Sequence, residues 1–437
     1  MSDPQNDPQQ PPVPLIARFE ELFSETGIEI DGEQSHLILL ATDSHIEPPP
    51  PNPGKPRASK GIGLYYEILE HTAIGDNVLL RQDTTTPPRP ASKVPLHLPN
   101  GLALTYGQIL GLGGDFYGIP EQPICDGATA AERLQRFTAA FNSLATAFSA
   151  KAEAGKILEV AKQEAAAVEQ AIHEGKPAHE AYEKLGDTLS EEWNKITGGG
   201  SFVSALFPLG RYLKLAANNP DHFGKWAKRA YIAGHSAALK QAVAAHGTQD
   251  TAALELAYAM NAFADHFLTD LFASGHLRVP RLELAAVVTP GDLGSLISRF
   301  MHDEDNQFGL KVRNSLSEHW RTFGDKRYFD LIPDEEQFAN QSHVKQATQA
   351  SADEVFDAYL SGKRPDESDF AALKHLPDLD DVHKVENNFS PLFRVQGNKV
   401  LRRKDVNNLN DTATVDDWWG WSTYLLLKDY HPAGNTN

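Results

Sequence analysis

The sequence predicts a mostly α-helical protein, a multi-helix bundle with a helical insertion and a small C-terminal α+β extension. Apolar residues recur at helical spacing in successive segments between residues 202 and 275. Residues 128–196 are rich in Ala, Glu and Lys, which favour helices. Short β-like runs separated by turn residues gather only after about residue 385. We therefore expect helices to build the body and a few strands to come at its end.

The N-terminal part is expected to alternate between polar loops and ordered segments. Residues 1–14 are polar and rich in proline, which is typical of a disordered tail. Residues 15–46 carry helical periodicity, and residues 61–80 are apolar enough to be ordered. A proline-rich loop is expected after each of these two segments, at residues 47–60 and 81–100.

Helices are then expected one after another. Residues 102–112 indicate a helix that stops at a pair of glycines. Residues 128–196 indicate two or three helices, which could form a hairpin that projects from the body. Further helices are expected throughout residues 202–275, from about residue 293 to 310, and at residues 346–361.

The chain is therefore expected to divide into a tail and two folded parts. After the tail of residues 1–14, residues 15–384 would form the main helical domain, with residues 128–200 as the helical insertion. Residues 385–437 would form the C-terminal extension. The tryptophans within residues 418–421 either pack in the core of this extension or contact a lipid surface.

The composition limits the classes of function. With 40 Lys plus Arg and 59 Asp plus Glu, the net charge is −19, so the surface repels phosphate backbones and general nucleic-acid binding is not expected. Cys125 is the only cysteine, so any metal must be held by His, Asp and Glu. The N-terminus lacks the pattern of a secretory signal peptide and no long apolar run is present. We expect a soluble protein, cytoplasmic or exported without a cleaved signal peptide.

The segment Phe263–Arg281 carries the most informative pattern, H-x3-D-x5-H at His266, Asp270 and His276. Positions i and i+4 share one face of a helix, so the first two side chains can hold one cation together. Imidazole nitrogens and carboxylate oxygens are zinc ligands, and a carboxylate between two histidines can bridge two ions. The alternative is a buried helix whose histidines are hydrogen-bonded.

Ligand-type residues also lie at the ends of other expected helices. His36 begins an apolar helix, Asp115 comes after a helix stop, and His222 lies at a helix start. His302 is followed by acidic residues within one turn. Each of these side chains alone could instead be a helix cap, a solvated charge or a hydrogen-bonded histidine.

Together and in this order, these residues resemble the zinc-dependent phospholipase C family, the bacterial phosphatidylcholine-hydrolysing enzymes related to zinc-dependent single-strand nucleases. His36 resembles the family's metal-binding histidine on an N-terminal helix, and Asp115 resembles its loop aspartate. Asp-His-Phe at residues 221–223 matches a family segment, and the H-x3-D-x5-H motif is matched in full. His302 fits the first position of a later H-x3-E/D motif. The resemblance extends over about residues 35–310.

The resemblance implies two or three Zn²⁺ ions. It implies one ion held by Asp115, His222, His266 and Asp270, a second held by His276, His302 and Asp305 with water, and a third held by His36 with Asp270 shared. Asp115 would also be the catalytic residue, because a carboxylate beside a metal-bound water can take its proton.

This chain departs from the family pattern in three places. No tryptophan precedes His36, although the family's processed N-terminal tryptophan ligates one zinc, and residues 128–200 would be an insertion. The position four after His302 is Asn306, a poor zinc ligand, so Asp305 or Asp303 would replace it. Asp305 is preferred because i+3 lies on the same helix face.

The resemblance implies a phosphodiesterase that hydrolyses glycerophospholipids such as phosphatidylcholine to diacylglycerol and a phosphorylated headgroup. Its partner would be the phospholipid substrate, with peripheral membrane contact possible. Two alternatives stay open, namely a nuclease or phosphomonoesterase with the same metals, and a non-catalytic helical interaction protein with a structural metal. The sequence leaves the oligomeric state unknown.

Overall fold

A computed structural model provides the architecture. It describes residues 68–176, 181, 185, 188–200, 209–247, 250–288, 291–324, 327–329, 335–418, 420–427 and 430–434. The expected tail, the expected helix at residues 15–46 and the first proline-rich loop lie outside these residues, and so does His36.

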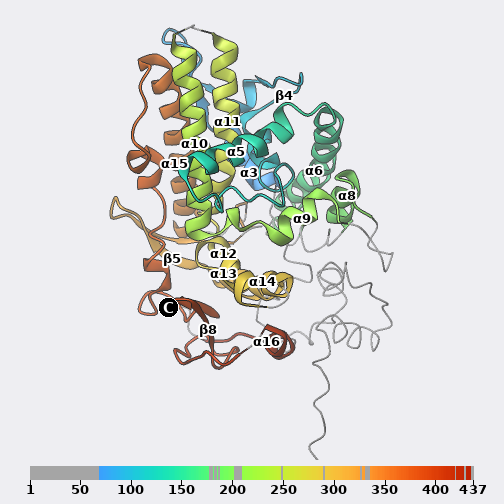
Figure 1. Ribbon diagram of the computed structural model, residues 1–437, viewed down its shortest axis with the longest axis vertical. Coiled ribbons are helices and arrows are strands. Elements are labelled where there is room, and N and C mark those ends of the chain that lie inside the picture. Colours follow the sequence, from blue (N-terminus) through green and yellow to red (C-terminus); the bar gives the residue numbers. More distant parts are fainter. Residues whose placement is uncertain are drawn as a thin grey trace, which may run out of the picture.

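The fold is mostly α-helical, as the sequence predicts (Figure 1). Its helical core consists of α10 (Gly224–His246), α11 (Thr251–Asp270) and α15 (Glu335–Ser361), which pack on one another. Helix α11 is buried along most of its length, because α4 (Tyr106–Leu112) packs on it as well. Asp250 caps the N-terminus of α11 by accepting a hydrogen bond from the Ala252 amide at 2.9 Å.

Helix α4 lies within the predicted helix at residues 102–112, but it begins at Tyr106 because residues 103–104 pair as a strand instead. It carries the chain toward the end of α11. Thr105 and Gln108 form a capping box at its start, and Gly113 ends it. Helix α3 (Ile68–Asp76) crosses α4 closely, since a Cβ added to Gly75 would lie 2.6 Å from Gly107 Cα. Two short hairpins replace much of the expected loop at residues 81–100. Strand β1 (Leu79–Leu80) pairs with β2 (Arg89–Pro90), and β3 (Leu96–His97) pairs with β4 (Ala103–Leu104). The 3-10 turn η2 (Ala91–Lys93) lies between the two hairpins in the sequence.

The expected insertion at residues 128–200 does not stand apart from the body. It contains α5 (Ala130–Ala145), α6 (Ala150–His173) and α8 (Thr188–Ile196). Helix α5 packs against α10, and its Phe137 and Phe141 are buried in the main core. The expectation of a projecting hairpin is therefore wrong for α5, because this helix has an apolar face that the Ala-, Glu- and Lys-rich composition of residues 128–196 as a whole obscured.

Shorter elements lie at both ends of the core helices. Helix α9 (Arg211–Asn218) and η3 (Pro220–His222) precede α10, and α12 (Ser274–Leu277), α13 (Arg281–Val287) and α14 (Gly291–Phe308) come after α11. A hairpin of β5 (Leu310–Arg313) and β6 (His319–Thr322) then leads to α15, which begins at Glu335 rather than at residue 346. Three short 3-10 turns come after α15, namely η4 (Glu367–Asp369), η5 (Ala371–Lys374) and η6 (Asp381–His383).

The C-terminal extension is small and of the α+β type, as the sequence predicts. Strands β7 (Phe393–Gln396), β8 (Lys399–Arg403) and β9 (Thr414–Val415) form an antiparallel sheet, and α16 (Gly420–Leu427) comes after it. Its apolar side packs on α13 and α14 in a second hydrophobic core that these two helices share. In Figure 1, β8 and α16 lie below α13 and α14. Trp421 is buried in that core and Trp418 packs beside it, so the core role applies to these two tryptophans rather than lipid contact.

Two buried ion pairs fix this extension and α12 to α14. Arg403 pairs with Glu304 at 2.6 Å, and Arg278 pairs with Asp305 at 2.7 Å, with all four side chains fully buried. The guanidinium of Arg278 also donates to the carbonyls of Val382 and Phe389. Because buried charges are costly unless paired and hydrogen-bonded, these contacts specify where α14 lies.

Within the described residues, the structure contains no helix with the length and apolar character that a bilayer crossing requires.

Candidate metal centre

The C-terminal end of α11 presents His266 and Asp270 on one face, as the i, i+4 spacing predicts. Both side chains are fully buried, and His266 Nε2 lies 3.9 Å from Asp270 Oδ2. The helix ends at Asp270, and Ala273 N–H bonds back to its carbonyl. The next turn carries the chain to α12 and returns His276 toward the same carboxylate, with Nδ1 3.6 Å from Asp270 Oδ1.

Asp115 reaches the cluster from the loop after α4. Its Oδ2 lies 3.9 Å from His266 Nε2, and its Oδ1 lies 3.8 Å from His222 Nε2. Gly114 makes this approach possible, because its φ of +70° lies in the left-handed region. A Cβ at Gly114 would meet His266 Nε2 at 2.4 Å and His222 Cε1 at 3.0 Å.

His222 enters from the 3-10 turn that precedes α10. Asn219 caps this turn, and Asp221 anchors it to the loop at residues 124–125 by accepting hydrogen bonds from two amides. His222 Nδ1 lies 2.9 Å from Asp270 Oδ2 and 3.2 Å from His266 Nε2. A turn, a loop and a helix end thus bring Asp115, His222, His266 and Asp270 together, as the resemblance implies.

His71 on α3 is a further member that the sequence analysis missed. Its ring stacks on His266 with centroids 4.3 Å apart, and its Nε2 lies 3.7 Å from Asp270 Oδ1. It lies in an apolar run, Ile68-Leu-Glu-His-Thr-Ala-Ile, which looks like ordinary core. The glycine four residues later, which permits the close crossing of α3 and α4, is the one signal that could have drawn attention to it.

Hydrogen bonds outside the cluster orient three of its histidines. His266 Nδ1 donates to the carbonyl of Leu110 at 3.0 Å, and His276 Nδ1 donates to the carbonyl of His222 at 3.0 Å. His71 Nδ1 donates to Thr269 Oγ1 at 2.7 Å, whose own hydrogen is directed to backbone carbonyls. With Nδ1 protonated, the Nε2 of each ring is the nitrogen with a lone pair, the form of histidine that ligates metals.

Burial keeps His266 and His71 neutral. It lowers the pKa of His266 to about 3, while Asp270 opposes the effect and His222 adds to it. Burial also holds the pKa of His71 well below its usual value, and the neighbouring His266, His222 and His276 lower it further. Histidines that stay unprotonated at neutral pH are competent to bind a cation without first losing a proton.

His302 on α14 lies beside His276, with ring centroids 5.1 Å apart. Phe223 stacks on the His276 ring, with centroids 4.9 Å apart. Asn306, one turn further along α14, faces His302, with Nδ2 3.2 Å from Nε2. Its Oδ1 accepts a hydrogen bond from the Gly275 amide at 2.6 Å. The asparagine therefore occupies the place beside His302 that the motif gives to a carboxylate.

The preference for Asp305 as a ligand is wrong for this structure. Its two oxygens accept hydrogen bonds from Arg278 at 2.7–3.2 Å, and the pair is fully buried. Asp303 lies closer to the site, since its Oδ1 is 3.0 Å from His302 Nδ1. Position i+3 lies only approximately on the helix face of His302. The Asp305 side chain instead turns toward Arg278, which comes from a turn distant in the sequence.

Several neighbouring side chains have structural roles. His235 is fully buried and bonds to Asn261 and Glu354, as expected for a core histidine. Tyr106 donates to Asp265 at 2.6 Å and is fully buried in the core, where Phe116 and Tyr117 are buried as well.

The donor set fits a divalent cation bound among several ligands. Two groups of three side chains each place ligand atoms within 4.8 Å of one another, namely His71, Asp115 and His266, and His222, His266 and Asp270. Histidine Nε2 atoms and carboxylate oxygens face one another at 3.7–3.9 Å, an arrangement that a shared cation stabilises. Asp115, His222, His276 and His302 are 4–8% exposed, so the cluster can be approached from their side.

Gly114→Ala should lower the free energy of unfolding by roughly 2–4 kcal/mol, because the added Cβ clashes with His266 and the left-handed φ becomes strained. Urea titration of the purified protein measures the change. Gly155→Ala on α6 is the matched control, since nothing lies within 4 Å of its added Cβ and it should be neutral or stabilising. Equal stability of the two variants would contradict the tight packing of Gly114.

Comparisons with protein-family models, with curated proteins and with solved structures found no match. The interpretation of the cluster therefore depends on its own geometry and on the order of its residues along the chain.

Proposed function

We propose that the protein is a zinc-dependent phosphodiesterase of the phospholipase C type, which hydrolyses glycerophospholipids to diacylglycerol and a phosphorylated headgroup. The observation that carries the proposal is the convergence of Asp115, His222, His266 and Asp270 from three separate elements, with His276 and His302 beside them. A structural site would be satisfied by four ligands, whereas more donors than one ion needs are typical of a multi-metal hydrolytic site.

The donors would divide among three ions. Asp115, His222, His266 and Asp270 would hold one zinc, His71 with Asp270 another, and His276 with His302 a third. His71 would take the part that the resemblance implies for His36, which lies outside the described residues. The bound zinc would supply hydroxide from water at neutral pH and neutralise charge on the phosphoryl oxygens.

Asp115 is the residue we assign to proton transfer. Its carboxylate lies at the partly exposed edge of the cluster, 7% exposed, whereas Asp270 is fully enclosed by histidines. A water attacking the phosphorus from that edge would give its proton to a carboxylate oxygen of Asp115. Asp270 would instead orient the rings around it, because its oxygens lie 2.9–3.9 Å from nitrogens of His71, His222, His266 and His276.

Metal analysis combined with a substrate panel tests the proposal. We expect two or three zinc ions per chain, and release of phosphocholine from dihexanoyl phosphatidylcholine that stops on chelation and returns with zinc. His266→Ala should remove zinc and activity, whereas His319→Ala, at an exposed position on β6, should keep both. Absence of stoichiometric metal would overturn the proposal. Cleavage of single-stranded DNA in place of the lipid would indicate a nuclease, and cleavage of p-nitrophenyl phosphate would indicate a phosphomonoesterase.

A further inference from the structure

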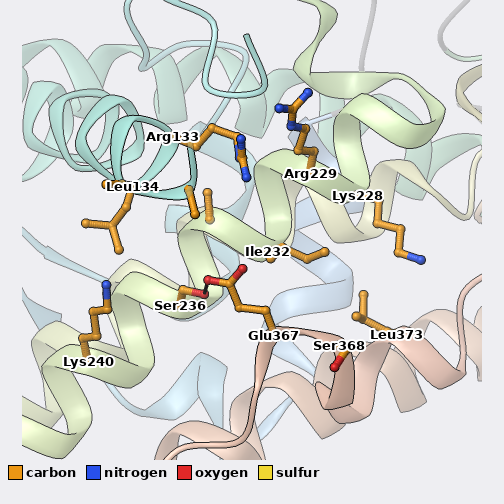
Figure 2. A pocket seen from close by; sticks show the side chains of 13 residues that line it. Arg133, Leu134, Lys228, Arg229, Ile232, Ser236, Lys240, Glu367, Ser368 and Leu373 are labelled. Atoms are coloured by element: carbon orange, nitrogen blue, oxygen red, sulfur yellow. Dashed lines mark hydrogen bonds between the residues drawn. The ribbon is translucent and has the colours of Figure 1, made fainter. Parts of the chain in front are cut away.

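A cavity of about 530 Å³ lies on the side of α10 that faces α5 and the turns η4 and η5 (Figure 2). Its size falls within the roughly 300–1,000 Å³ that small-molecule sites occupy. None of the residues of the metal centre lines it. The cavity is therefore a separate feature, although its Lys228 and Arg229 lie on the helix that begins directly after His222 and Phe223.

The lining of this cavity is basic, in contrast to a chain with a net charge of −19. Arg133 from α5 and Lys228, Arg229 and Lys240 from α10 surround it, against one carboxylate, Glu367. In Figure 2 the two arginines lie at one end and Lys240 lies toward the other, with Glu367 between them. The cavity thus concentrates positive charge in a chain whose net charge is negative.

The two arginines converge without a protein anion between them. Arg133 Nη1 donates to the carbonyl of Gly127 at 2.9 Å, and Arg229 Nη2 donates to the same carbonyl at 3.3 Å. Within the part of the chain that the structure describes, no carboxylate lies within 4.0 Å of a charged nitrogen of Arg133, Lys228, Arg229 or Lys240. Two guanidinium groups held on one neutral acceptor repel each other, and an anion between them relieves that repulsion.

Glu367 is one carboxylate against four cationic side chains, so it offsets only part of this charge. Its Oε1 accepts a hydrogen bond from Ser236 Oγ at 2.9 Å, which holds the carboxylate against α10. By contrast, the buried arginines Arg278 and Arg403 are each paired with a carboxylate at 2.6–2.7 Å. Arg133 and Arg229 in the cavity therefore differ from these two buried arginines, because neither is paired with a carboxylate of the described residues.

The floor of the cavity is apolar. Leu134, Ile232 and Leu373 line it and pack against the main hydrophobic core as partly buried side chains. A ligand that fits both parts has an anionic group for the arginines and an apolar group for the floor. A phosphomonoester group matches better than a carboxylate, because it carries nearly two negative charges and three acceptor oxygens for several cationic donors.

We propose that this cavity is a binding site for a small phosphorylated organic molecule, with Arg133 and Arg229 on the phosphoryl group and Leu134, Ile232 and Leu373 on its apolar part. Lys228 and Lys240 would add charge at the rim. The site is independent of the metal centre and of the function proposed for it.

Calorimetric titration of the full chain with 1-naphthylmethylphosphonate tests the proposal, because a phosphonate cannot be hydrolysed by a phosphoesterase. We expect saturable binding that the double variant Arg133→Gln/Arg229→Gln weakens by at least about tenfold. Lys156→Gln/Lys345→Gln removes the same two positive charges from exposed positions elsewhere and should leave the affinity unchanged. 1-Naphthylacetate should bind at least about tenfold more weakly and the neutral 1-naphthylmethanol should not bind.

Two further variants keep the outcome decisive. Lys240→Gln changes an exposed side chain that the fold does not need, so weaker phosphonate binding by this variant would support the site even if the double variant fails to fold. His276→Ala in the metal centre should bind the phosphonate as tightly as the original chain. If His276→Ala abolishes binding while the arginine variant keeps it, the ligand lies in the metal centre and the proposal is wrong. Absence of binding, or equal affinity for 1-naphthylacetate, also overturns it.

Discussion

Asp270→Asn should abolish zinc binding and lower phosphodiesterase activity by at least about 10³-fold, the equivalent of about 4 kcal/mol in the barrier. The carboxylate faces four histidine rings, with oxygen–nitrogen distances from 2.9 Å for His222 to 3.9 Å for His266. An amide keeps the size of the side chain but removes the negative charge that a shared cation requires. Elemental analysis and phosphocholine release measure the two effects.

Asp250→Asn is the matched control for this prediction. It makes the same substitution on the same helix, at an N-cap where asparagine serves as well as aspartate. Chelation should lower the melting temperature of this control and of the original chain, and should leave that of Asp270→Asn unchanged, because only ligand-bound protein is stabilised by the ligand. Stoichiometric zinc in Asp270→Asn would show that this carboxylate is not central to the site.

Arg403→Met should lower the free energy of unfolding by about 3–5 kcal/mol, because it leaves the carboxylate of Glu304 buried without its cation. Arg403 also donates to the carbonyls of Ser390 and Val406, so two acceptors lose a donor as well. The nearby Arg402→Met, at a partly exposed position, is the control and should cost less than about 1 kcal/mol. Urea denaturation of both variants gives the comparison.

The pH dependence of Arg403→Met identifies the cause. Burial raises the pKa of Glu304 from 4.5 to about 7, and Arg403 opposes this rise, so the pKa rises further without the arginine. A carboxyl whose folded pKa lies above its unfolded value favours the folded state below the unfolded pKa and loses that contribution as pH rises through the folded pKa. Below about pH 7 both proteins lose this contribution alike, so the deficit of Arg403→Met should grow between about pH 7 and about pH 9. The free energy of unfolding of Glu304→Gln/Arg403→Met should not change over this pH range. A steep pH dependence of this double variant would rule out Glu304 as the source.

The parts of the site that the sequence predicted are those fixed by local geometry or by the order of motifs. The spacing of His266 and Asp270 determines their common helix face, and the glycine pair before Asp115 marks the turn that directs it inward. Their meeting with His222 was implied by the resemblance and not by spacing, because nothing in the sequence measures the distance between separate elements.

The remaining parts depended on tertiary contacts. His71 looked like a core histidine until the crossing of α3 over α4 brought it onto His266. Asp305 was preferred because position i+3 lies on the helix face of His302, but Arg278 binds both of its oxygens, and Asn306 lies beside His302 instead. The basic cavity was equally hidden, since its cations come from two helices about a hundred residues apart, as Arg133 and Arg229 show.

The paired charges on α14 also bear on the order in which the protein matures during synthesis. His302 lies two residues before Glu304, whose buried partner is Arg403, and Tyr430 donates a hydrogen bond to the same carboxylate. The histidines of α11 and α12 leave the ribosome long before those partners do. The nascent chain can therefore fold its central helices early, while the last histidine of the cluster becomes fixed only after residue 403 has been translated.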